Sequence, residues 1–181
     1  MTENSGPLWC ARFPSTARLD DLLPEFGDAC RAFISQLKRA GATVSVAATF
    51  RPPERAYLMH WCCMIANSGQ DPYAVPPMKG VNIDWAHGGA LLRAREAAKK
   101  MMAKYQIVFP AALTSRHTQR RAIDMTISWK GTLRITDFNG RIHAIAGGPR
   151  NGSHPQLIAV GKTFGVVKLP SDPPHWSDDG R

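Results

Sequence analysis

His117 and Asp124 stand seven residues apart in a polar stretch, and both side chains are of types that bind metal ions. On one α-helix they would lie about 10 Å apart along the axis, too far for two bonds of about 2 Å to one ion. On one regular strand, an odd offset places them on opposite faces. The chain must therefore turn between them, and the polar residues 118–121 are where it can do so.

An alternating pattern follows this turn and predicts a half-buried strand over residues 122–129. One face carries the apolar side chains Ile123, Met125, Ile127 and Trp129, and the other carries Asp124, Thr126 and Ser128. Asp124 is therefore expected on the polar face, directed toward a site.

Asp172 and His175 flank two prolines near the C-terminal end of the sequence. The prolines exclude a helix and favour polyproline II, whose three-residue turn would point both side chains to the same side. With His117 and Asp124, His175 completes two imidazoles and one carboxylate. This is the ligand number of a catalytic zinc ion that keeps one position for water, and Asp172 would be free to act as a base.

The stretch Ser115-x-His117-x-x-x-x-Ala122-x-Asp124 resembles a signature of the zinc D-Ala-D-Ala carboxypeptidase family, Ser-x-His-x-x-Gly-x-Ala-x-Asp. That family includes D,D-dipeptidases and carboxypeptidases of vancomycin resistance and phage L-alanyl-D-glutamate endolysins. Arg120 occupies the glycine position of the signature. This departure bears on substrate preference more than on metal binding.

The segment Asp172-x-x-His175-Trp176 is similar to the closing Glu/Asp-x-x-His motif of the same family. The family also has an arginine just after a strand, and Arg51 follows a predicted strand over residues 42–50. The resemblance is strong over 115–128 and 172–176, fair around Arg51, and weak elsewhere.

The resemblance implies one Zn²⁺ ion per chain, bound by His117, Asp124 and His175. It assigns Asp172 as the base and Arg51 as the group that polarises the scissile carbonyl. From the sequence alone, Arg51 could equally be a solvated loop cation. Three further residues are expected to bind substrate: Ser115, Arg120 and Trp176. Ser115 could instead orient His117.

The function that the resemblance implies is hydrolysis of peptidoglycan stem peptides, with the L-alanyl-D-glutamate endopeptidase as the first expectation. The alternatives are a D-Ala-D-Ala carboxypeptidase or dipeptidase, a non-catalytic zinc module that binds the cell wall, and a basic nucleic-acid binder. The net charge of +9 predicts attraction to polyanions. No nucleic-acid motif accompanies this charge, so nucleic acid is not the expected partner. The resemblance implies bacterial peptidoglycan as the partner.

No apolar run reaches the length of a membrane span, and residues 1–13 lack the pattern of a signal peptide. We therefore expect synthesis in the cytoplasm and no membrane insertion. The resemblance implies action on the cell wall once the protein is released by phage lysis or as an effector, and we expect it to be a monomer. The four cysteines lack paired spacing and are expected to be reduced thiols.

The expected fold is α+β, a single domain with a mainly antiparallel sheet flanked by helices, similar to the Hedgehog/DD-peptidase fold. Residues 1–15 are expected to form an irregular arm, and residues 16–181 the zinc peptidase domain. Helices are predicted over 19–37, 53–65, 91–105 and after Ser153, and strands over 42–50, 122–129, 132–136 and 166–169.

Three local features carry more specific predictions. Lys130-Gly131 is expected to join the strands on either side of it in a hairpin, with a further turn at Asn139-Gly140. Ser153 and Gln156 are expected to form a capping box. The loop over residues 67–89 is expected to be either a wall of the substrate groove or an inert insertion.

Overall fold

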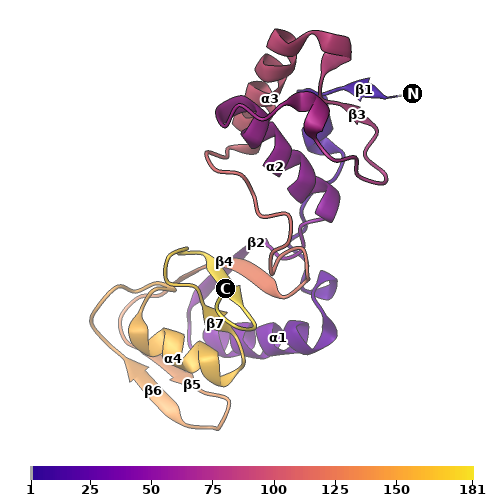
Figure 1. Cartoon of the computed structure of the whole chain (residues 1–181). Helices are drawn as coiled ribbons and strands as arrows, with labels where there is room; N and C mark the ends of the chain where they lie inside the picture. Colours follow the sequence, from indigo (N-terminus) through magenta and orange to yellow (C-terminus); the bar gives the residue numbers. More distant parts are fainter. Residues whose placement is uncertain (1) are drawn as a thin grey trace. The chain divides into compact units, whose positions relative to one another are not determined.

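The computed structural model describes residues 2–181, and this chain divides into two compact units (Figure 1). Unit 1 contains the residues up to Ser15 together with Arg51–Thr118. Unit 2 contains Thr16–Phe50 and Gln119–Arg181. The expected boundary after residue 15 coincides with the first point at which the chain passes between units. The chain passes between the units again after Phe50 and after Thr118, and both points lie inside the range that was predicted as one domain.

Unit 2 is built on a four-stranded antiparallel sheet, which confirms the predicted α+β class. Its strands, in spatial order, are β2 (Thr43–Ala48), β4 (Ala122–Ser128), β8 (His175–Ser177) and β7 (Val167–Lys168). A separate hairpin is formed by β5 (Leu133–Thr136) and β6 (Ile142–Ile145). Two helices belong to the same unit, α1 (Pro24–Arg39) and α4 (Pro155–Thr163).

The core of unit 2 lies between the apolar face of β4 and the helices α1 and α4. Helix α1 begins at Pro24, whose fixed φ suits the first helical position. Its apolar side chains recur at helical spacing and are buried, among them Phe33 and Leu37. Each such side chain stabilises the fold by about 1.5–3 kcal/mol through burial. This core fixes the position of β4 and of the strand beside it.

Unit 1 consists mainly of the helices α2 (Pro53–Asn67) and α3 (Leu91–Tyr105), both close to their predicted ranges. The arm was expected to be irregular, but it contains strand β1 (Glu3–Asn4) and the 3-10 helix η1 (Pro7–Ala11). Strand β1 pairs in parallel with β3 (Ile83–Asp84), and Trp9 of η1 is buried in the core of unit 1. Hydrophobic burial therefore orders this segment, which local sequence signals alone did not indicate.

The long loop over residues 67–89 is largely ordered by its own short elements. These are η3 (Pro72–Ala74), β3 and η4 (His87–Gly89). Trp85 is buried, and its Nε1–H donates to the hydroxyl of Tyr57 at 3.1 Å. With Tyr73 and Asp84, Trp85 lines a cavity of about 450 Å³ within unit 1.

Of three local predictions in unit 2, two are wrong and one is confirmed. Lys130-Gly131 does not join paired strands, because β4 pairs with β2 and β8 whereas β5 pairs with β6. The turn at Asn139-Gly140 is confirmed, since Gly140 adopts a φ of 84° between β5 and β6. The N-cap of α4 is His154 rather than Ser153, and its Nδ1 accepts the Gln156 N–H at 3.2 Å.

The cysteines of the described residues are all buried free thiols. Burial raises the pKa of Cys30 to about 12, so this thiol does not ionise near neutral pH. Across residues 2–181, no helix combines the length and apolar character that a bilayer-spanning segment requires.

Candidate metal centre

Strand β4 presents Asp124 on its polar face, as the alternating sequence predicts. Its neighbours Ile123 and Met125 are almost fully buried, whereas the Asp124 side chain keeps 20% of its exposure. In the antiparallel register, Asp124 lies directly opposite His175 of β8. Residues directly opposite each other have Cβ atoms about 5 Å apart on one face, so the two side chains meet.

His117 lies in a turn that Ser115 and Thr118 stabilise together. The Thr118 hydroxyl donates to the Ser115 carbonyl at 2.9 Å and accepts the Ser115 N–H at 2.8 Å, while the Thr118 N–H donates to Ser115 Oγ at 3.3 Å. The Arg51 N–H donates to the His117 carbonyl at 3.3 Å. Ser115 therefore supports the turn that carries His117, which is consistent with the orienting role.

His117, Asp124 and His175 form a buried cluster that could hold a metal ion. One ligand atom from each residue lies within 4.8 Å of the other two. His175 Nδ1 and Asp124 Oδ1 are 3.2 Å apart. Two ligands bound tetrahedrally at about 2.0 Å from one ion are separated by roughly 3.3 Å, so this pair already has suitable spacing. Two imidazoles and one carboxylate are also a donor set that zinc accepts in catalytic sites.

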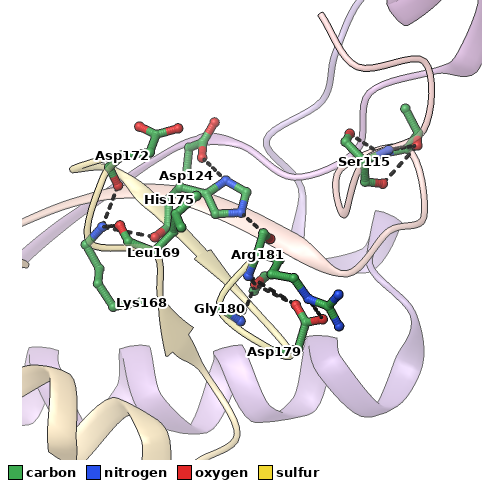
Figure 2. Close-up of polar contacts among 11 residues, drawn as sticks. Ser115, Asp124, Lys168, Leu169, Asp172, His175, Asp179, Gly180 and Arg181 are labelled. Carbon is green, nitrogen blue, oxygen red and sulfur yellow. Dashed lines mark hydrogen bonds and ion pairs between the residues drawn. The ribbon is translucent and has the colours of Figure 1, made fainter.

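The imidazole of His175 is held at both nitrogens (Figure 2). Its Nε2 lies 3.1 Å from the carbonyl oxygen of Arg181. A carbonyl oxygen only accepts, so Nε2 donates to it, and the contact with Asp124 is a hydrogen bond when Nδ1 also carries a hydrogen, as it does in the protonated ring. The Nδ1 lone pair becomes available to a metal ion once that proton is lost. The Arg181 segment is itself fixed by Ser177, whose Oγ accepts the N–H groups of Gly180 and Arg181 at 2.8 and 3.0 Å.

The surroundings of His175 favour its protonated form when no metal is bound. Burial lowers the pKa of His175, but the hydrogen bond to Asp124, the Arg181 carbonyl and the charge of Asp172 together raise it above its usual value. A metal ion must displace this proton. Protons therefore compete with a metal ion for His175 up to a higher pH than they would at an imidazole with the usual pKa.

Asp172 lies on the turn that leads into β8, and its side chain is exposed. The predicted polyproline II conformation is wrong, because two successive turns form instead. The Asp172 N–H donates to the Leu169 carbonyl at 3.2 Å, and the His175 N–H donates to the Asp172 carbonyl at 3.0 Å. The negative charge of Asp172 contributes to the raised pKa of His175.

Trp176 and Arg120 were expected to bind substrate, and the structure contradicts this prediction for Trp176. Trp176 is fully buried, with its ring centroid 5.6 Å from that of Phe33, so it offers no surface to a substrate. Arg120 has a φ of 61°, and its guanidinium lies 4.8 Å from the centre of the Phe50 ring. The glycine of the family signature therefore coincides with a left-handed backbone position, where glycine is unstrained.

This conformation predicts an unusual order of stability for two variants of Arg120. Both Arg120→Ala and Arg120→Gly remove the contact with Phe50, but only glycine relieves the left-handed strain of about 1 kcal/mol. We expect the glycine variant to be more stable than the alanine variant by about that amount. Urea unfolding of the two proteins measures the difference. Equal stabilities, or a more stable alanine variant, would contradict the strain at this position.

Lys168 is a functional candidate that the sequence reasoning missed. It is the second residue of β7 and is only 4% exposed. Burial lowers the pKa of Lys168 below its usual value, although the charges of Asp172 and Asp124 act in the opposite direction. The signal in the sequence was a lysine inside the apolar run Val166–Leu169, since a buried charge requires compensating partners.

Neither the models of known protein families nor the curated proteins contain a match to this chain.

Proposed function

We propose that this chain is a zinc peptidase that hydrolyses the stem peptides of bacterial peptidoglycan, with the Hedgehog/DD-peptidase fold. The observation that carries the proposal is the convergence of His117, Asp124 and His175 within 4.8 Å. These are the residues at the ligand positions of the two motifs that resemble the zinc carboxypeptidase family. The antiparallel placement of Asp124 opposite His175 on neighbouring strands supports the same assignment.

Zinc bound by these residues would supply a Lewis acid that polarises the scissile carbonyl. Asp172 would take the proton of the attacking water and deliver it to the leaving amine. Its position on the exposed side of the turn before His175 suits this role, because the carboxylate remains open to solvent and substrate. Arg51 would stabilise the negative charge that develops on the carbonyl oxygen.

Within this class we propose cleavage between L-Ala and D-Glu, as in the phage endolysins that the motifs resemble. The net charge of +9 would hold the protein near anionic polymers of the cell envelope. This attraction weakens as salt screens it, over a distance of about 8 Å at physiological ionic strength. We propose that the protein works as a monomer on the cell wall, after synthesis in the cytoplasm.

The test is digestion of purified sacculi by the zinc-loaded protein, with mass spectrometry of the products and His175→Ala as the inactive control. A new amino terminus on D-Glu would support the endopeptidase. Release of D-Ala alone would replace it with the carboxypeptidase. Zinc binding without any cleavage would overturn the enzymatic proposal in favour of a non-catalytic zinc module.

Arg51→Ala should lower turnover by roughly 10² while leaving the zinc content unchanged, because one oxyanion-stabilising group is lost. Arg51 is placed beside His117 by the hydrogen bond between their backbones, so it is close to one of the proposed ligands. Arg39→Ala, at the exposed end of α1, is the matched control. Turnover of Arg51→Ala equal to that of this control would reduce Arg51 to a solvated loop cation.

A further inference from the structure

The turn over residues 169–175 is a ring of three hydrogen bonds. The Leu169 N–H donates to the His175 carbonyl at 3.1 Å, and the Asp172 N–H donates to the Leu169 carbonyl at 3.2 Å. The His175 N–H donates to the Asp172 carbonyl at 3.0 Å and closes the ring. Each of these three residues thus gives one backbone bond and receives one.

The ammonium group of Lys168 caps this ring by donating to the same three carbonyl oxygens (Figure 2). Its Nζ lies 2.7 Å from the Leu169 oxygen and 3.1 Å from the His175 oxygen, and it also contacts the Asp172 oxygen. An ammonium has three donors, and each carbonyl has two lone pairs, so both sets are fully used. The Lys168 side chain is buried, so these bonds replace its hydration.

We propose that Lys168 is the positioning residue that sets the conformation of the 169–175 turn, and thereby the placement of Asp172 and His175. Without the ammonium, the three carbonyl dipoles converge on an apolar stem with no donor between them, which favours opening of the turn. No other common side chain brings three donors from a single nitrogen on a flexible stem. The consequence for metal affinity rests on the proposed zinc site, whereas the consequence for the turn does not.

The test compares Lys168→Met with Lys162→Met, a matched control at an exposed position in the last turn of α4. Methionine keeps an unbranched stem and removes all three donors. In metal-free protein, the amides of Asp172 and His175 should exchange hydrogen at least about tenfold faster in Lys168→Met, since bonds to a charged group are lost. Hydrogen exchange of the amides in β4 should change much less.

The second readout is zinc affinity, measured by competition with a chelator. Loss of outer contacts that orient ligands lowers metal affinity by about 10- to 100-fold, so Lys168→Met should bind zinc correspondingly more weakly than Lys162→Met. If the wild-type protein bound no zinc, the proposed function would fail, and the exchange measurement alone would decide the role of Lys168. Unchanged exchange in the turn would overturn the proposal whatever the zinc affinity.

Should Lys168→Met not fold, Lys168→Arg provides the same test with the charge retained. The planar guanidinium spreads its donors over a fork and cannot direct three of them from one atom. Faster exchange of the Asp172 and His175 amides in a folded Lys168→Arg would support the proposal. Exchange equal to that of the wild-type protein would show that charge, and not the three-donor geometry, holds the turn.

Discussion

His175→Ala should reduce the zinc content from close to one ion per chain to nearly none, and His117→Ala should do the same. Each substitution leaves two of the three ligands whose atoms now lie within 4.8 Å of one another. Two protein ligands rarely retain a catalytic zinc ion, because such sites use three. Elemental analysis of the purified proteins after dialysis measures the change directly.

His143→Ala is the matched control for this experiment, because its imidazole bonds Asp137 at 2.8 Å in the β5–β6 hairpin and is not part of the cluster. It should retain the full zinc content. Circular dichroism must show that all three variants remain folded. Full zinc occupancy in folded His117→Ala or His175→Ala would refute the ligand assignment.

Asp172→Asn should keep the zinc and the fold but lower turnover by about 10² to 10⁴, the range expected for loss of a general base. The asparagine retains the backbone carbonyl that Lys168 contacts, so the turn is preserved. Only the ability to accept a proton is removed. Steady-state hydrolysis of a stem peptide, together with a zinc assay on the same sample, separates the two effects.

Asp28→Asn is a suitable control, since Asp28 is exposed on α1 and pairs only with Arg31 among the ion pairs described. It should leave turnover unchanged. Activity of Asp172→Asn close to that of Asp28→Asn would mean that another carboxylate accepts the proton.

The strand that carries Asp124 could be predicted from the sequence because its signal is local. The alternation over residues 122–128 directly reports which face is buried, and the structure shows the same alternation. The helices α1, α2 and α3 were predictable for a similar reason, since their apolar positions recur with helical spacing. Strong periodicity therefore sufficed wherever one face of an element meets a core.

The features that sequence reasoning missed depend on partners distant in the chain. Strand β1 is too short for a periodic pattern, and it forms because β3 lies beside it, about eighty residues later. Lys130-Gly131 has the composition of a hairpin turn, but β5 instead pairs with β6. In both cases, tertiary pairing overrides a weak local preference.

The candidate site shows the same division. The ligand types and their spacing were legible in the sequence, whereas the support of the site was not. Lys168 donates to three backbone carbonyl oxygens. Every residue has such an oxygen, so the sequence does not show which ones a lysine contacts. The left-handed backbone at Arg120 was equally invisible in the sequence, because a non-glycine residue gives no sign of a positive φ.

The two-sided character of β4 also limits how a chain of this kind can change during evolution. Successive residues of β4 alternate between the packed interior and the face that carries Asp124. A substitution alters one face at one point and can be compensated by its neighbours. An inserted or deleted residue exchanges the two faces from that point onward, placing a carboxylate in the interior and an isoleucine among the ligands. Drift in this strand is therefore confined to replacements that conserve its length, while the surrounding turns remain free to grow or shrink.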